Sequence, residues 1–211
     1  QVFEVDNSFE TVTGDSDSWP SDFGNITVEP GDWLLKDFIK LAKVKSVQID
    51  FQEEGKTDWG ISRESETGDF AFLTPVEGEE IDKTKTGTFK SLLSSPRFKD
   101  VLSKEKADAI DMSKGVKAVV TTFDGFTYNF DVGPKDDEAG TFPVSFTVAA
   151  DIPETRTPEE GESEEDKKTK DEEFATTKKE LEEKLARESA LSEHWFALNS
   201  WDADEFFKEK D

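Results

Sequence analysis

The chain carries its clearest folding signal in the stretch Gly31-Asp32-Trp33-Leu34-Leu35-Lys36-Asp37-Phe38-Ile39-Lys40-Leu41-Ala42-Lys43-Val44-Lys45-Ser46-Val47-Gln48-Ile49-Asp50-Phe51. In its first half, apolar residues recur at helical spacing, which predicts a short helix over residues 33–42. In its second half, Val47, Ile49 and Phe51 alternate with polar residues, as in a half-buried β-strand. We therefore expect a helix that leads directly into a strand.

Two later segments continue the two-residue alternation. Residues 58–63 and residues 69–73 each alternate apolar and polar side chains, and a polar turn over residues 64–68 separates them. The three strands together predict an antiparallel meander packed against the helix. Trp33 and Trp59 both fall on the apolar sides of their elements, so we expect them to share one core.

A hairpin is the firmest local prediction further along the chain. Residues 116–123 and 126–132 alternate as strands, and Asp124-Gly125 between them suits the positive backbone angles of a type I′ turn. Residues 142–148 predict a third strand. Pro143 cannot donate a ladder hydrogen bond, so we expect this strand at a sheet edge or Pro143 as its first residue.

A helical pattern of apolar residues covers residues 88–103, after a polar connection over residues 74–87. Pro96 interrupts this pattern, because proline lacks the backbone N–H and restricts the residue before it. We therefore expect a core-facing helix that kinks or restarts near Ser94-Ser95.

The composition changes abruptly over residues 152–193, where acidic and basic side chains dominate. We predict a solvated loop over residues 155–170 and an exposed helix over residues 171–189, inserted into a single domain of residues 1–211. Because the insertion has little apolar area, we expect it to be dispensable for folding. A partner-binding helix would show the same pattern.

Residues 194–211 regain aromatic density and are expected to return to the core. Residues 195–198 suit a strand, and Asp202 with Glu205 resembles a capping box that opens a last short helix. The whole pattern predicts an α+β fold, with antiparallel sheets (the meander and the hairpin) packed with a few short helices, plus the charged helical insertion.

The charge balance argues against two classes of partner. With 50 Asp and Glu against 26 Lys and Arg in 211 residues, the net charge is −24 at pH 7. Such a charge repels the phosphate backbone of nucleic acids and anionic membrane surfaces. The 18 Phe and 5 Trp residues predict a core rich in aromatic side chains.

The chain has no cysteine and a single histidine, His194, which exclude disulfides, thiol chemistry and multi-histidine zinc sites within one chain. We expect no metal and no cofactor. No apolar run of about 18 residues could span a bilayer. Because the sequence starts at Gln1 and not at methionine, we expect that an export signal or membrane anchor has been removed upstream, and that any membrane contact is through that segment.

An acid hydrolase is one of two functional hypotheses. Such an enzyme needs two carboxyl groups, one protonated and one ionised. The stretch Val120-Thr121-Thr122-Phe123-Asp124-Gly125 distantly resembles the active-site loop of aspartic proteases, although it lacks the Thr or Ser between Asp and Gly. Asp124 is then the first catalytic candidate, with Asp69 or Asp131 as its partner. His194 is a weaker acid-base candidate, because no nucleophile neighbours it in the sequence.

The other hypothesis starts from a family resemblance, carried by the motifs Trp33–Ile39, Val44–Val47, the strand around Trp59, the helical pattern Phe89–Leu102, Phe123–Phe126 and Asp131–Gly133. Over about residues 30–150 and the tail, this pattern resembles the bacterial family catalogued as domain of unknown function 4340. The resemblance implies an extracytoplasmic α+β domain, commonly behind one N-terminal membrane helix, in proteins often associated with transporter or gliding-type envelope systems. The family has no established catalytic residues, and the charged insertion departs from its pattern.

We therefore expect a non-catalytic, periplasmic or extracellular domain of the cell envelope. Its partner would be an envelope protein or a glycan, bound through aromatic surface. Trp59 and Trp201 are the candidate binding residues, since tryptophan is enriched at recognition sites.

Overall fold

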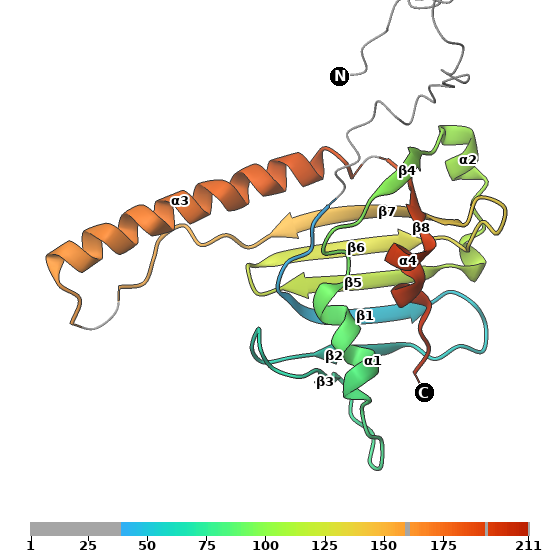
Figure 1. Ribbon diagram of the computed structural model, residues 1–211, viewed down its shortest axis with the longest axis horizontal. Helices are drawn as coiled ribbons and strands as arrows, with labels where there is room; N and C mark the ends of the chain where they lie inside the picture. Colours follow the sequence, from blue (N-terminus) through green and yellow to red (C-terminus); the bar gives the residue numbers. More distant parts are fainter. Residues whose placement is uncertain (1–38, 159–160, 193, 211) are drawn as a thin grey trace, which may run out of the picture. The chain divides into compact units, whose positions relative to one another are not determined.

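The computed structural model describes residues 39–158, 161–192 and 194–210 (Figure 1), all within one compact unit, Leu35–Asp211. This part of the chain forms an eight-stranded antiparallel sheet in the order β3-β2-β1-β5-β6-β7-β8-β4, accompanied by a few short helices and one long one. The predicted α+β class is confirmed. Trp33, and most of the helix expected over residues 33–42, lie outside the described residues.

The strands are β1 (Val44–Phe51), β2 (Trp59–Ser62), β3 (Ala71–Phe72), β4 (Phe98–Val101), β5 (Val116–Thr122), β6 (Phe126–Val132), β7 (Thr141–Ala150) and β8 (Phe196–Asn199). The helices are α1 (Lys83–Gly87), α2 (Lys104–Asp108), α3 (Glu164–Ser189) and α4 (Ser200–Ala203), with 3-10 turns η3 (Thr88–Ser91), η4 (Met112–Lys114) and η5 (Asp204–Phe207). The meander β1-β2-β3 and the pair β5-β6 are confirmed.

The described end of the first predicted helix, residues 39–42, is not helical. Ile39 and Leu41 are buried while Lys40 between them is exposed, which is an extended alternation. The N–H of Leu41 donates to the carbonyl of Leu93 at 3.0 Å. In a helix the same N–H would donate to a carbonyl four residues earlier in the chain. For these residues the helix prediction was wrong, because Leu41 fits both the helical spacing from Leu34 and Phe38 and the two-residue alternation with Ile39.

The hairpin β5-β6 has a turn of three residues, Phe123, Asp124 and Gly125. Among these, positive φ occurs at Gly125 (87°) and not at Asp124, so the predicted two-residue type I′ turn is wrong. A longer loop in which a glycine takes the left-handed conformation is the next common hairpin solution. Thr122 donates a hydrogen bond to the Asp124 carboxylate and thereby fixes the aspartate at the tip.

Pro143 lies inside β7, between β6 and β8, so it is neither at an edge nor first in its strand. Its carbonyl accepts from the N–H of Gly133 at 2.8 Å, just past the end of β6 at Val132. A residue's N–H and C=O point to the same side of an antiparallel strand. The missing N–H of Pro143 therefore faces a position where β6 has already ended, and the sheet tolerates the proline there.

The predicted helix over residues 88–103 is replaced by two elements. Residues 88–91 form η3, which continues α1, and residues 98–101 form the edge strand β4. Leu93 has a φ of 46°, a left-handed value that ends helical structure, and Pro96 follows shortly after it. Beyond this break, pairing with β8 decides the conformation of Phe98–Val101.

One face of the sheet is covered by helices and the other is open. The covered face carries a continuous aromatic core, with Tyr128 and Phe130 of β6 stacked at 6.0 Å between ring centroids. The helices α1 and α4 cross in front of the strands in Figure 1, and η5 packs Phe206 on Phe130 at 5.3 Å. The opposite face shows the polar residues of the alternation, including Gln48 and Asn129, as is usual for antiparallel sheets.

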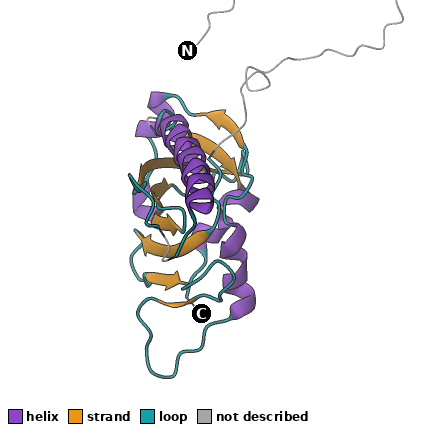
Figure 2. Cartoon of the chain, turned by 90° about the vertical axis from the view of Figure 1, so that its left-hand side faces the viewer, coloured by secondary structure: helices purple, strands orange, loops and turns teal. Residues whose placement is uncertain are grey.

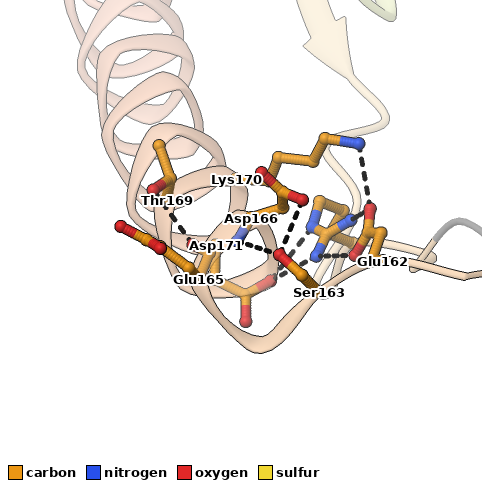
Figure 3. Close-up of polar contacts among 8 residues, drawn as sticks. Glu162, Ser163, Glu165, Asp166, Thr169, Lys170 and Asp171 are labelled. Atoms are coloured by element: carbon orange, nitrogen blue, oxygen red, sulfur yellow. Dashed lines mark hydrogen bonds and ion pairs between the residues drawn. The ribbon is translucent and has the colours of Figure 1, made fainter.

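The long helix α3 starts seven residues before the predicted position and lies nearest the viewer in Figure 2. Ser163 caps it by accepting from the N–H of Asp166 at 3.1 Å, and donates to the Asp166 carboxylate at 2.7 Å (Figure 3). This serine, three residues before an acidic side chain, is a start signal that the charge-rich composition obscured. The loop predicted over residues 155–170 is thus helical from Glu164 onward.

A charged cluster clamps the loop before α3 onto the first turns of the helix. The Glu162 carboxylate, 6% exposed, accepts two hydrogen bonds from the Arg156 guanidinium at 2.6 and 2.8 Å and one from Lys170 at 3.1 Å (Figure 3). Arg156 also pairs with Asp171 at 2.9 Å. Paired, bidentate contacts of this kind hold a geometry that single surface ion pairs do not.

The C-terminal segment returns to the core as predicted, through β8 between β7 and β4. The expected capping box is wrong, because Asp202 lies inside α4 and accepts from the N–H of Arg97 at 3.4 Å, while Glu205 pairs with Lys208 at 2.7 Å. Phe206 is fully buried. Beyond it, residues 208–210 reach β2 and β3 at the opposite edge of the sheet from β4.

Candidate functional site

A cleft of about 310 Å³ lies where the β2-β3 edge of the sheet meets α1, η3 and the C-terminal segment. Its apolar walls are the side chains of Trp59, Ile61, Phe72, Ile81 and Phe89. Its rim is polar and consists of Asp82, Lys85, Thr86, Lys208, Glu209 and Lys210. We call this the aromatic cleft.

Trp59 is fixed in the aromatic cleft from two sides. It faces the helix-covered side because it pairs with Ile49 of β1, whose side chain is in the core. Its ring meets Phe89 edge to face, with 5.5 Å between centroids, and its indole N–H donates to the carbonyl of Lys208 at 2.9 Å. The ring is half-buried, so part of it faces the cleft.

The charged groups at the rim of the aromatic cleft are already paired. Lys210 lies 4.6 Å from the Phe72 ring centroid and 2.6 Å from Glu79, and Lys208 pairs with Glu205. Asp82 caps α1 by accepting from backbone N–H groups, and those hydrogen bonds lower its pKa. These rim groups are directed to their own partners, and the walls inside the cleft are the apolar side chains named above.

A second hollow, of about 680 Å³, adjoins the aromatic cleft on the open face of the sheet. The two share the lining residues Trp59, Phe72 and Lys210. Leu73 and Val76, 43% and 54% exposed, form one wall of the second hollow. We call it the open-face hollow.

Gly60 allows Leu73 to lie across β2 beside the open-face hollow. A Cβ at position 60 would come within 2.7 Å of the Leu73 side chain. The N–H of Leu73 donates to the Gly60 carbonyl at 2.9 Å and holds it there. Any side chain at position 60 would therefore displace Leu73.

Of the predicted site residues, Trp59 lines both hollows, whereas Trp201 lines neither. Trp201 is 72% exposed on α4. His194 is exposed after α3, with its ring edge-on to Phe196 at 6.3 Å between centroids. The sequence analysis missed the cleft's C-terminal wall, because nothing in residues 208–210 indicates that they cross to β2.

The candidate catalytic carboxyl groups lie far apart. Asp124 is at the tip of the β5-β6 hairpin, and Asp131 lies near the other end of β6, opposite Lys117. At the rise of a strand, seven residues separate these two by roughly 20 Å. Each aspartate has a structural role in the hairpin, Asp124 as the acceptor from Thr122 in the turn and Asp131 as the cross-strand partner of Lys117.

Asp69 lies before β3, four strands from β6 in the sheet order. Lys83 and Lys90 pair with its carboxylate at 3.0 and 3.5 Å, and the hydrogen bond from Lys83 lowers the pKa of Asp69. No two of the three candidates thus form the close pair that an acid hydrolase of this type requires.

A buried polar cluster that the sequence analysis missed attaches α3 to the sheet. Glu188 of α3 is fully buried and accepts from the Tyr128 hydroxyl at 2.7 Å and from the backbone N–H of Lys40 at 3.5 Å. Lys184 donates to the Tyr128 oxygen at 2.7 Å and lies 3.8 Å from the Phe126 ring centroid. The i,i+4 spacing of Lys184 and Glu188 was the signal available in the sequence.

Tyr128 should resist ionisation in the folded protein. Burial, and next the hydrogen bond to Glu188, raise the pKa of Tyr128 above its usual value of about 10. Because the pKa of Tyr128 is higher in the folded than in the unfolded protein, the neutral hydroxyl stabilises the folded state at a pH below the unfolded pKa of about 10. This contribution to the free energy of unfolding is lost as the pH rises from about 10 toward the folded pKa. Burial of Lys184 lowers its pKa, so this group makes the folded state more stable as the pH rises toward 10.5, which is the opposite dependence.

Because Tyr128 is the sole tyrosine, the ultraviolet absorbance of tyrosinate reports its ionisation directly. We expect the absorbance to rise near pH 10 in denaturant but, without denaturant, only together with loss of circular dichroism. Tyrosinate formation near pH 10 in folded protein would contradict the burial of this hydroxyl.

Within residues 39–210, apart from the three that are not described there, no helix is both long and apolar enough to cross a bilayer. The same residues contain no group of three or more His, Cys, Asp and Glu side chains placed to hold a metal ion. Comparisons with models of known families, with curated proteins and with solved structures found no match to this chain.

Proposed function

We propose that this chain is a non-catalytic binding module of the cell envelope, and that its aromatic cleft takes an apolar side chain of a protein partner. The observation that carries the proposal is the half-buried ring of Trp59, held rigidly in an apolar cleft at a sheet edge. Rigid aromatic anchors in pockets are typical of recognition sites. The envelope location is supported by the family resemblance alone.

The state of the polar groups favours a protein side chain over a sugar. A saccharide needs hydrogen-bond partners directed into its site. In the aromatic cleft the Trp59 N–H, the Asp82 carboxylate and the Lys210 ammonium group already have partners. A volume of about 310 Å³ lies at the lower limit for small-molecule sites and suits one bulky side chain.

N-acetyl-tryptophanamide, which mimics a single apolar side chain of a peptide, tests the proposal on the full chain. We expect it to shift the Trp59 indole N–H resonance in nuclear magnetic resonance spectra, while oligomers of N-acetylglucosamine do not. Thr86→Trp, at the rim of the cleft, should abolish the shift by filling the cavity.

Thr176→Trp is the matched control. Thr86 and Thr176 both lie in helices and both donate to the carbonyl four residues earlier, at 3.0 and 2.9 Å. The control should leave the Trp59 shift unchanged. If Thr86→Trp had no effect, the aromatic cleft would not be the site, and a shift caused by the sugar oligomers would replace the protein partner with a glycan.

A further inference from the structure

The strand β7 continues beyond the end of its neighbour β8. It runs to Ala150, whereas its pairing with β8 covers only residues 141–144. On its other side, β7 stays paired with β6 as far as Ala150. Residues 145–150 of β7 therefore have a strand neighbour on one side alone.

The direction of the backbone groups at this edge follows from the pairing with β6. The carbonyl of Pro143 and the N–H of Asp151 both form hydrogen bonds on the side of β6. The N–H and C=O of one residue point to the same side of an antiparallel strand, and the side alternates from residue to residue. Ala149 thus bonds toward β6, whereas Val148 and Ala150 face away from it.

Among the described residues, none forms a hydrogen bond with the backbone of Val148 or Ala150 on that side. We call these N–H and C=O groups the free edge of β7. Natural sheets ordinarily block such an edge with charged side chains or prolines. Residues 141–150 contain no charged side chain, although 36% of the chain is charged, and the one proline among them faces β6. The free edge therefore has no block of its own.

The helix α3 contacts β7 and lies along it (Figure 1). Leu181 and Leu185 pack their half-buried side chains against the core, and Lys178 pairs at 2.8 Å with Glu154 in the loop that follows β7. Glu188 is the one buried residue of this fully described helix and attaches its C-terminal end to the sheet. Covering an edge with a helix is a known means of preventing strand addition.

We infer that α3 is a cover that keeps the free edge of β7 from pairing with the same edge of a second copy of this chain. Two antiparallel β7 strands related by a two-fold axis present the same unpaired groups to each other. Residues 145–150 are uncharged, so no like charges would meet along the paired segment. This inference does not depend on the proposed function, because the aromatic cleft lies at the β2-β3 edge of the sheet.

Two neighbouring alanines test whether the edge is free. Ala149→Pro removes an N–H that bonds to β6 and should lower the melting temperature by about 6 to 12 °C. Ala150→Pro removes an N–H that faces away from β6 and should lower it by less than about 3 °C. Equal losses in the two variants would overturn the inference, because the backbone of Ala150 would then have a partner.

Leu181→Glu with Leu185→Glu uncovers the edge in the full chain. Glutamate preserves helix propensity, but burying unpaired carboxylates against the sheet is costly, so α3 can no longer dock. In sedimentation equilibrium we expect the unmodified chain to be a monomer and this double variant to be a dimer. Thr177→Glu with Ala186→Glu makes the same change of net charge on the exposed face of α3 and should remain a monomer.

The site of association is checked in the dimer. Hydrogen exchange of the Val148 and Ala150 amides should slow at least about tenfold when they bond to the second copy. Adding Ala150→Pro to the double variant should restore the monomer, because a proline blocks strand pairing at this edge.

Three results would overturn the inference. They are a dimer of the unmodified chain, a double variant that keeps its circular dichroism and stays a monomer, and a dimer that persists after Ala150→Pro is added. If the two glutamates unfold the chain, Leu181→Ser with Leu185→Ser decides in the same comparisons, since it removes the apolar contacts of α3 without adding charge.

Discussion

Replacing Glu188 with alanine should lower the free energy of unfolding by about 3 to 4 kcal/mol. The substitution leaves the buried Tyr128 hydroxyl without its acceptor and removes the anion beside Lys184. An unsatisfied buried polar group costs about 1 to 3 kcal/mol, and breaking a buried ion pair costs up to about 5 kcal/mol. Lys184 can still turn partly toward solvent, which keeps the expected loss below that maximum. Denaturant unfolding measures it.

Glu183→Ala is the control, because Glu183 is exposed on the same helix and should change stability by less than about 0.5 kcal/mol. Tyr128→Phe completes a double-mutant cycle, in which we expect the two losses to overlap. A loss below about 1 kcal/mol for Glu188→Ala would show that α3 leaves the sheet readily. That the insertion is dispensable for folding stays a prediction, although Glu188, which belongs to it, is buried against the sheet.

Phe206→Ala should cost about 3 to 5 kcal/mol, the usual range for removing a fully buried phenylalanine. The Phe206 ring packs on Phe130 at the centre of the covered face and so holds the C-terminal segment down. The same segment supplies Lys208, whose carbonyl accepts from Trp59. We therefore expect the Trp59 indole N–H resonance to move toward its solvent-exposed position in this variant, in addition to the loss of stability.

The exposed Trp201 serves as the comparison within the same segment. Trp201→Ala should change the free energy of unfolding by less than about 0.5 kcal/mol and leave the Trp59 resonance in place. If Phe206→Ala lowered stability without moving that resonance, the wall of the aromatic cleft would be held independently of the Phe206 anchor.

The strands of the central sheet could be predicted because their period of two is strict. In β6, buried apolar and polar residues alternate along the whole strand, and in β5 burial alternates in the same way, so a single periodicity fits. Short apolar segments were harder to predict. Leu41 fits both the helical spacing from Phe38 and the alternation with Ile39. Phe98 and Val101 are three residues apart, as in a helix, and β4 accommodates them through a register shift between Phe98 and Asp100. There the neighbouring strand or loop decides the structure.

The candidate site was predicted only through one residue, Trp59. The alternation in β2 predicted that Trp59 lies on the apolar side of its strand. Much of the rest of the cleft comes from α1, η3 and the C-terminal segment. Contacts between segments so distant in the sequence produce no periodic pattern of apolar residues from which they could be predicted. The candidate carboxylates failed to meet for a related reason, since proximity across the sheet depends on strand order, which local patterns do not specify.

The pairing of β4 with β8 has a consequence for biosynthesis. β4 has a single neighbour in the sheet, and Phe98 pairs with Leu198, so it has no partner strand until β8 has been made. The strands β5, β6 and β7 are joined by short connections and can pair as they leave the ribosome. A nascent chain that ends within α3 would thus expose Phe98–Val101 to chaperones and proteases. When β8 is made, it pairs with β7 on one side and with β4 on the other, and so completes the sheet.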